Sequence, residues 1–513
     1  MQGPEGIVKF SKTMHILWAI AAVLITVHGQ PPLACDSVGD DSPVCSCGSG
    51  RVSCKDANLT DVPTDIPPDT DTLELSGNKI TSLPAMAFDG LPQLTTLELS
   101  DNEISSIEVG AFDGLGDSLE KLYLNDNDLV SLEDGILRNL TTLKYLYLKD
   151  NKISTLSSGV FRGLSSLFQI FFDGNSISSF PVDIFSDTPA LKAVELPNNR
   201  IRRLDNILPS LPSNLGTLDL SGNNLGSLEP AAFRRFSTLS DLALKSCNIS
   251  VLPKDALLGL DNLYFFYMDD NNLVELKNNS FGDHRRLAIA SFINNKIATI
   301  EAGLFGRFPR LGNLNLQSNS LTSLPPGVFD NLSRLRELRL ENNNIESLDD
   351  PDIFKDLQSV WFIYLQQNNL KSLPSGVFSE ANLENLKILV LDNNAITEIE
   401  NGTFDNLPSI KSIYMQQNPI QNVGCEMVPN MDMSPSLEKL YISCDCHLKP
   451  LYDCPNFSWR LGPKTVCQSP LWLWRRSLNV ISSDRLVCAG ASVKANWFAL
   501  AILVLLSNLF MST

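Results

Sequence analysis

The sequence predicts a horseshoe-shaped α/β solenoid, with a parallel β-sheet on its concave face and disulfide caps at both ends. Three observations lead to this prediction. An asparagine recurs about every 24 residues within one apolar frame, as in residues 94–104, LTTLELSDNEI. Apolar and polar residues alternate just before each asparagine, which is typical of a short strand with one buried face. The cysteines gather near the two ends of the chain.

The recurring asparagine belongs to the frame L-x-x-L-x-L-x-x-N-x-L, which resembles a leucine-rich repeat, including the tolerated cysteine in the asparagine column. The column consists of Asn78, Asn102, Asn127, Asn151, Asn175, Asn199, Asn223, Cys247, Asn271, Asn295, Asn319, Asn343, Asn368, Asn394 and Asn418. One such repeat cannot bury its own apolar face, so neighbouring repeats must stack to form a core. The resemblance therefore implies a long, exposed inner sheet that is suited to binding.

Within each repeat, the two leucines of L-x-L should point inward because strand side chains alternate between faces. The asparagine should then hydrogen-bond the backbone of the turn that follows. About ten residues later most repeats carry a phenylalanine, which we interpret as a spine in the outer half of the core. The row consists of Phe88, Phe112, Phe161, Phe185, Phe233, Phe281, Phe305, Phe329, Phe378 and Phe404.

Both ends of the chain carry sequences that predict secretion and anchoring. Lys9 and Lys12 precede an apolar run at 16–27, so residues 1–29 are interpreted as a signal peptide. Residues 497–511 are apolar and follow a run of small residues at 489–492. This order favours a GPI-attachment signal, with Gly490 as the attachment residue, over a minimal membrane span.

The expected domain organisation follows from these features. It comprises a signal peptide at 1–29, an N-terminal cysteine-rich cap at 30–67, about fifteen repeats at 68–443, a C-terminal cysteine-rich cap at 444–488 and a GPI-attachment signal at 489–513. Cysteines crowded at the ends of a repeat array predict disulfide-stapled caps and an oxidising compartment. The formal net charge of −18 argues against a nucleic-acid partner.

The cap sequences resemble those of extracellular leucine-rich-repeat proteins such as variable lymphocyte receptors, Slit, Toll-type ectodomains and the Nogo receptor. Four cysteines between 35 and 54 precede LTDVPTDIP at 59–67, and CDCHL at 444–448 begins the second cap. Residues 324–332, LPPGVFDNL, resemble repeats of variable lymphocyte receptors. The resemblance implies the pairs Cys35–Cys47, Cys45–Cys54, Cys444–Cys467 and Cys446–Cys488. We pair Cys425 with Cys454, although other connectivities among the last six cysteines stay open.

Catalytic and metal chemistry find little support in the sequence. Zinc ligation is conceivable for Cys444, Cys446, His447 and Cys454, but an oxidising compartment favours disulfides. Only His284 and His447 lie beyond the signal peptide, and no phosphate-binding glycine-rich loop follows a strand. The odd cysteine, Cys247, is expected to be a buried turn residue. We therefore predict a protein that is not an enzyme and that needs no cofactor or metal.

The residue between the two strand leucines should line the concave sheet. In chain order this column reads Glu74, Glu98, Tyr123, Tyr147, Phe171, Glu195, Asp219, Ala243, Tyr267, Ser291, Asn315, Arg339, Tyr364, Val390, Tyr414 and Tyr441. Aromatic residues are enriched at binding hot spots, although strand propensity alone also favours them. The predicted ligand-binding residues form three groups: Tyr123, Tyr147 and Phe171 with Lys149 and Asp173; Phe265, Tyr267 and Asp269; and Trp361 with Tyr364.

Sequons and basic pairs mark other exposed positions. Glycan acceptors are predicted at Asn58, Asn139, Asn248, Asn278, Asn331, Asn401 and Asn456. The pairs Arg202–Arg203, Arg234–Arg235 and Arg285–Arg286 lie outside the strands, and we interpret them as solvated charge rather than as a heparan-type glycan contact.

Together these features predict a GPI-anchored glycoprotein at the outer face of the plasma membrane. Its expected role is that of an immune-type receptor that binds an extracellular protein or glycan on the concave face. The alternative is a cell-adhesion or guidance protein that binds a host cell-surface or matrix partner, because the fold does not fix the ligand. Its oligomeric state is open.

The anchoring hypothesis has a direct test. Phosphatidylinositol-specific phospholipase C is expected to release the protein from intact expressing cells, as measured by surface immunostaining and blotting of the medium. If the protein stays on the cells and retains an epitope placed at Thr513, the anchor is a membrane span instead.

Overall fold

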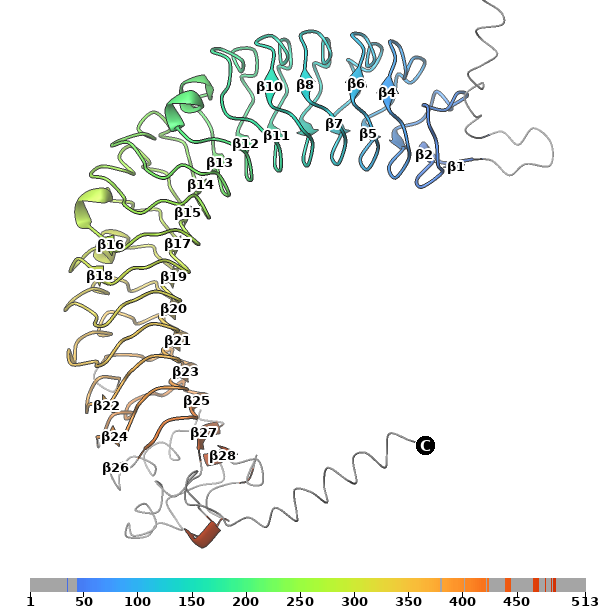
Figure 1. Ribbon diagram of the computed structural model, residues 1–513. Coiled ribbons are helices and arrows are strands. Elements are labelled where there is room, and N and C mark those ends of the chain that lie inside the picture. Colours follow the sequence, from blue (N-terminus) through green and yellow to red (C-terminus); the bar gives the residue numbers. More distant parts are fainter. Residues whose placement is uncertain are drawn as a thin grey trace, which may run out of the picture. The chain divides into compact units, whose positions relative to one another are not determined.

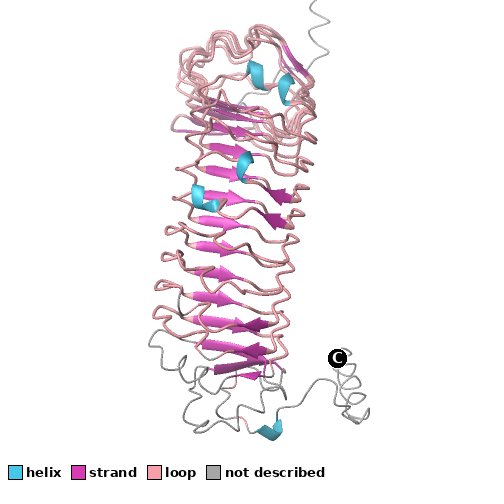
Figure 2. Cartoon of the chain, turned by 90° about the vertical axis from the view of Figure 1, so that its left-hand side faces the viewer, coloured by secondary structure: helices cyan, strands magenta, loops and turns pink. Residues whose placement is uncertain are grey.

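The computed structural model describes residues 35, 44–378, 381–400, 402–420, 422–423, 439–443, 465–469, 476, 481 and 483–485. The chain divides into two compact units, one formed by residues up to 201 with 205–215, the other by 202–204 with residues from 216 onward. Each unit is a solenoid whose turns contribute one strand apiece to a parallel sheet (Figures 1 and 2). The predicted parallel-strand solenoid is thereby confirmed.

In the first unit the sheet begins with an antiparallel hairpin and continues with parallel strands. From β2 onward, each three-residue strand buries its middle residue and in most turns leaves the two flanking residues partly exposed. The strands are β1 (Ser46–Gly48), β2 (Arg51–Ser53), β3 (Thr72–Glu74), β5 (Thr96–Glu98), β7 (Lys121–Tyr123), β9 (Tyr145–Tyr147), β11 (Gln169–Phe171) and β12 (Ala193–Glu195).

The second unit repeats the same parallel arrangement. Its sheet strands are β13 (Thr217–Asp219), β14 (Asp241–Ala243), β15 (Phe265–Tyr267), β17 (Ile289–Ser291), β19 (Asn313–Asn315), β20 (Glu337–Arg339), β21 (Phe362–Tyr364), β23 (Ile388–Val390), β25 (Ser412–Met415), β27 (Lys439–Ser443) and β28 (Thr465–Ser469). Successive strands pair with equivalent residues opposite one another, so each strand position forms a column along the sheet.

The return segments of the turns contain short strands, turns and 3-10 helices, and no α-helix occurs among the described residues. Proline and glycine interrupt these segments, as in LPPG at 324–327, and both disfavour α-helix. The short strands are β4 (Ser82–Leu83), β6 (Ser106–Ile107), β8 (Ser131–Leu132), β10 (Thr155–Leu156), β16 (Glu275–Leu276), β18 (Thr299–Ile300), β22 (Ser372–Leu373), β24 (Glu398–Ile399) and β26 (Asn422–Val423). The 3-10 helices are η1 (Leu204–Asn206), η2 (Leu208–Ser210), η3 (Asn278–Ser280), η4 (Phe305–Arg307) and η8 (Ser483–Arg485).

The asparagine column joins neighbouring turns through buried hydrogen bonds. The Asn102 amide donates to the carbonyl of Leu75 in the preceding turn (2.9 Å) and to that of Leu99 in its own turn (3.1 Å). Its Oδ1 accepts from the backbone N–H of Ile80 (3.1 Å). One side chain therefore satisfies backbone groups that the stacking of turns removes from water.

Cys247 occupies this column without reproducing all of these bonds. It is a buried free cysteine whose Sγ lies 3.3 Å from the Leu220 carbonyl, the acceptor that an asparagine amide would use. Burial raises the pKa of the thiol to about 12, so it remains a protonated, weak donor. The structure confirms the expected burial of this residue.

The phenylalanine row forms the predicted spine in the outer half of the core. Phe88 and Phe112 stack with ring centroids 5.9 Å apart, and Phe354 and Phe378 stack at 5.6 Å. Phe354 was missing from the sequence prediction because it lies eleven residues after Asn343, one more than the usual spacing. The insertion near Asp349 displaces it in sequence but not in the stack.

The N-terminal cap contains the two disulfides that the resemblance implied, Cys35–Cys47 and Cys45–Cys54. Strand β2 pairs antiparallel with β1 and parallel with β3, so the cap covers the end of the first sheet. In the second cap, Cys467 is buried and disulfide-bonded. Cys425, Cys444, Cys446, Cys454 and Cys488 lie outside the described residues.

The predicted signal peptide at 1–29 and the attachment segment at 489–513, with Gly490, also lie outside the described residues. Among the residues that are described, no helix has the length and apolarity needed to span a bilayer.

The asparagine column can be tested by a pair of substitutions in the second unit. Asn319→Ala leaves the Phe292 and Leu316 carbonyls and the Ile297 N–H without this partner, so a loss of roughly 2–5 kcal/mol in unfolding free energy is expected. Cys247→Asn supplies the missing donor and acceptor and should add about 0.5–1.5 kcal/mol. Urea unfolding measures both changes. An unchanged midpoint for Asn319→Ala would contradict a structural role for the column.

Candidate ligand-binding surface

The register of the strands places the predicted outward column on the exposed side of each sheet. In the first unit, Glu98 lies opposite Tyr123, Tyr123 opposite Tyr147, and Tyr147 opposite Phe171. All of these side chains are partly exposed, whereas the leucine or isoleucine in the middle of each strand is buried. The alternation of the strands therefore produces the column expected from the sequence.

Tyr123, Tyr147 and Phe171 form a continuous ring stack, here called the aromatic ladder. Ring centroids lie 4.2 Å apart between Tyr123 and Tyr147 and 4.4 Å apart between Tyr147 and Phe171. The planes are within 7° and 8° of parallel in these two pairs. Such offset-stacked geometry stabilises each pair by about 0.5–1.5 kcal/mol beyond area burial. The three rings therefore hold one another in place at the surface.

Charged groups border the aromatic ladder. The Lys149 ammonium lies 3.6 Å from the Asp173 carboxylate, and the Lys149 backbone N–H donates to Asn125 Oδ1 (2.9 Å). Burial, followed by the neighbouring Tyr123 hydroxyl, raises the pKa of Tyr147 to about 12. The Tyr147 hydroxyl is therefore a neutral hydrogen-bond donor at physiological pH.

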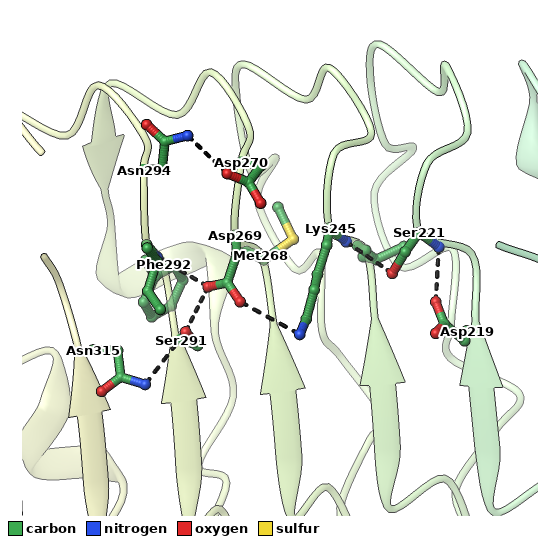
Figure 3. Close-up of polar contacts among 12 residues, drawn as sticks. Asp219, Ser221, Lys245, Met268, Asp269, Asp270, Ser291, Phe292, Asn294 and Asn315 are labelled. Atoms are coloured by element: carbon green, nitrogen blue, oxygen red, sulfur yellow. Dashed lines mark hydrogen bonds and ion pairs between the residues drawn. The ribbon is translucent and has the colours of Figure 1, made fainter. Parts of the chain in front are cut away.

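The second predicted group is organised by Lys245, which the sequence analysis did not include. Phe265 and Tyr267 stack at 6.3 Å on the same strand, and the Lys245 ammonium lies 4.4 Å from the Tyr267 ring centroid. Asp269 is only 7% exposed and accepts from the Ser291 hydroxyl and from the Ile293 N–H (2.9 Å). Its second oxygen lies 3.6 Å from the Lys245 ammonium, as Figure 3 shows. Asp269 thus orients the lysine from within the sheet.

The third predicted group separates into two aromatic–cation arrangements. Tyr364 stacks with Phe362 and lies beneath the Arg339 guanidinium, 4.5 Å from carbon to ring centroid. Arg339 in turn binds Glu337 (2.6 Å) and Glu341 (3.0 Å), and burial raises the pKa of Glu341. Trp361 lies directly before β21, three residues before Tyr364.

Trp361 is contacted by two cations from neighbouring turns. The guanidinium carbon of Arg336 lies 5.0 Å from its ring centroid, and the Lys387 ammonium lies 4.1 Å away. These side chains occupy the position directly before each strand, as do Tyr264 and Phe168. Trp361 was predicted from the sequence but the rest of this column was not, although the period of the repeat would have revealed it.

His284 and the sequons have distinct environments. His284 is 3% exposed, with Nδ1 3.2 Å from the Leu260 carbonyl and Nε2 accepting from the Gly282 N–H. Burial lowers its pKa, so this histidine is a neutral core residue rather than a surface base. Of the predicted glycan acceptors, four are exposed: Asn58, Asn139, Asn248 and Asn331.

Asn278 is only partly exposed, and its Nδ2 donates to the Ala302 carbonyl (3.1 Å). A glycan at this position would leave Nδ2 a single N–H with which to keep that bond. Asn401 and Asn456 lie outside the described residues. No group of metal-binding side chains occurs in the part of the chain that the structure describes.

The contacts of Asp269 predict that substitutions of Asp269 and of Lys245 will affect stability unequally. Asp269→Ala leaves the Ser291 hydroxyl and the Ile293 N–H without their acceptor, with an expected loss of about 1–3 kcal/mol in stability. Lys245→Met removes an ion pair whose lysine side chain is 42% exposed, so the loss should stay within about 1 kcal/mol. Thermal unfolding of both variants measures the difference. Equal effects would contradict the structural role assigned to Asp269.

Comparisons with known proteins agree with this architecture. The leucine rich repeat family model matches residues 68–117, 117–177, 213–273, 285–345, 309–370 and 362–420. Leucine-rich repeat-containing protein 3B of Homo sapiens is 42% identical over 98 residues, 19% of this chain and 38% of that protein. The chain thus matches well under half the length of this relative.

Two solved structures share the fold at low sequence identity. A leucine-rich-repeat protein of Leptospira interrogans superposes with a TM-score of 0.58 at 21% identity, covering 76% of this chain and 88% of that one. A chain of the Toll–Spatzle complex of Drosophila superposes with a TM-score of 0.59 at 20% identity, covering 83% and 56%. Because the family matches together span more than half of the 513 residues, this chain belongs to the leucine-rich-repeat family.

Proposed function

We propose that this protein is a cell-surface recognition receptor of the immune type, which binds an extracellular protein or glycan on the exposed side of its sheet. The aromatic ladder of Tyr123, Tyr147 and Phe171 carries the proposal. Three parallel rings on successive strands form a contiguous apolar surface with hydroxyl groups at two positions. Such surfaces are typical of the central anchors of binding interfaces.

The rigidity of the ladder supports a role in binding. An exposed aromatic side chain normally loses rotamer freedom when a ligand immobilises it, which costs about 0.5–1.5 kcal/mol for each side chain. Here stacking restricts the rings before any ligand arrives. A partner therefore meets a preorganised surface, and more of the contact energy contributes to affinity.

The surroundings of the ladder supply polar groups for specificity. Tyr145 and Phe168 form an edge-to-face pair beside it (6.1 Å), with Phe168 43% exposed. The Lys144–Glu120 and Lys149–Asp173 ion pairs lie on the same strands and the turns next to them. An apolar centre with a charged rim is the usual composition of a protein interface.

Location is the second part of the proposal. Disulfides near the N-terminus imply folding in an oxidising compartment, and four exposed sequons are available for glycans. We propose that the mature protein is held at the outer face of the plasma membrane by a GPI anchor. A chain of the same fold takes part in a protein–protein complex, the Toll–Spatzle complex.

The proposal predicts opposite phenotypes for adjacent residues of β9. Tyr147→Ala should reach the cell surface, because it removes only two ring contacts, but should weaken ligand binding by about 2 kcal/mol or more. Leu146→Ala should lower stability by about 2–5 kcal/mol and reduce the surface level, because Leu146 is fully buried. Ligand captured by crosslinking to the intact protein on cells, followed by affinity measurement, provides the assay.

Tyr414→Ala is the matched control, since Tyr414 occupies the same outward column in the second unit. Its affinity should equal that of the unmodified protein. Normal binding by Tyr147→Ala would place the ligand on another face. Sequencing the positions of Tyr123, Tyr147 and Phe171 in different individuals or clones distinguishes the two candidate functions. Diversity at these positions supports an immune receptor, and invariance supports an adhesion or guidance protein.

A further inference from the structure

A pocket of about 510 Å³ opens in the second unit, beside the starts of β15, β17, β19 and β20. Its lining includes Tyr264 and Phe265 on one side and Arg310, Arg334 and Arg336 on the other. Asp269 and the ring of Tyr267 do not line it. The pocket therefore belongs to a different unit from the aromatic ladder, and it shares only Phe265 with the second predicted group.

The hollow arises from two small residues in the column directly before the strands. Tyr264, Ala288, Gly312 and Arg336 follow one another in this column, linked by backbone hydrogen bonds from each residue to the one before. A Cβ at Gly312 would meet nothing closer than the Ala288 carbonyl at 3.5 Å, an ordinary contact. The backbone does not require glycine there, so the missing side chain serves to leave space.

The charge of the pocket is unusual for this chain. Arg310 and Arg334 occupy the same place in successive turns, three residues before the strand begins, and Arg286 occupies that place one turn earlier. All three side chains are exposed, and none forms an ion pair with a described residue. Arg336 contacts the Trp361 ring, while the nearby Glu337 is engaged by Arg339 and Asn313.

Unpaired like charges on adjacent turns repel one another. The chain has 58 acidic residues against 40 basic ones, yet no described carboxylate neutralises this row. An anionic ligand would remove the repulsion and gain hydrogen bonds from the guanidinium groups, whose planar donors match carboxylate and sulfate oxygens.

We infer that this pocket binds an anionic saccharide, with its acidic groups on Arg310, Arg334 and Arg336 and a sugar ring against Tyr264. Tyr264 is 45% exposed and stands edge-to-face with Phe265 (4.7 Å), so it presents a fixed apolar wall. The turns stack at roughly the 4.8 Å spacing of neighbouring strands. A chain with regularly repeated negative groups therefore suits the row of arginines.

The disulfide-bonded cap implies a compartment where acidic glycans, rather than nucleotides, are the abundant polyanions. This pocket lies in a different unit from the aromatic ladder, and its test uses acidic saccharides and second-unit variants, so either proposal can fail without the other.

Calorimetric titration of the purified full-length protein tests the site. The probes are a heparin tetrasaccharide, which carries sulfate and carboxylate groups, sialyllactose, which carries a carboxylate alone, and neutral maltotetraose. The proposal is supported if either acidic probe binds and maltotetraose does not, and the probe that binds identifies the acidic group. No binding of either acidic probe overturns it.

Two kinds of variant locate the binding. Arg310→Gln and Arg334→Gln should each weaken the acidic probe by roughly tenfold or more, as for loss of a charged hydrogen bond. Gly312→Leu fills the hollow without changing charge and should also reduce affinity by at least about tenfold. Arg200→Gln, an exposed arginine of the first unit, is the matched control and should bind normally.

Unchanged affinity in Gly312→Leu, with the variant folded by circular dichroism, would place the ligand outside the pocket and overturn the proposal. Gly312→Ser fills less space and should retain most of the affinity, which separates blocking from misfolding. Inorganic polyphosphate is the last probe: if it binds as tightly as heparin, the arginines recognise charge alone and the saccharide assignment is wrong.

Discussion

The hydrogen bonds of the asparagine column are the constraint on which the rest of this structure depends. Stacking one turn on another buries backbone groups that no sheet ladder satisfies. Within a unit, an asparagine links the carbonyl of the preceding turn, that of its own turn and an N–H of the preceding return segment, as Asn343 does with Leu316, Leu340 and Leu321. Since a turn cannot shift without breaking all three, the register of the strands follows. The outward columns inherit their alignment from this buried row.

Much of the fold could be predicted from the sequence because the period of the repeat determines both the core and the exposed side. The leucines, the phenylalanine spine and the outward column from Glu74 to Tyr414 follow from counting along the repeat, although Ser291 in that column is only 1% exposed. Cys247 was placed correctly for the same reason. Phe354 was not predicted because an insertion lengthened one return segment by a residue. The division near residues 202–216 is not visible in the periodicity, which continues from Asn199 to Asn223.

The candidate site was less predictable, because contacts depend on side-chain directions as well as on column membership. Adjacent aromatic residues on adjacent strands were enough to foresee the ladder. The cations over Tyr267, Tyr364 and Trp361 were not foreseen, since long flexible side chains from neighbouring turns reach these rings. Asp269 was expected to face a ligand by alternation, but the carboxylate turns back toward Ser291 and the Ile293 N–H. The period of the repeat predicts where a residue lies on the sheet, and local hydrogen bonds decide where its side chain points.

Neighbouring turns of equal length have an evolutionary consequence. Asn127 and Asn151 occupy identical places 24 residues apart, so removal of the intervening segment would leave a complete core and a complete asparagine row. The same event would bring Tyr123 beside Phe171, shortening the exposed stack by one ring. Recombination between repeats can therefore add or remove whole turns of a recognition surface. Because the core and the asparagine row stay complete after such a change, the altered chain can still fold.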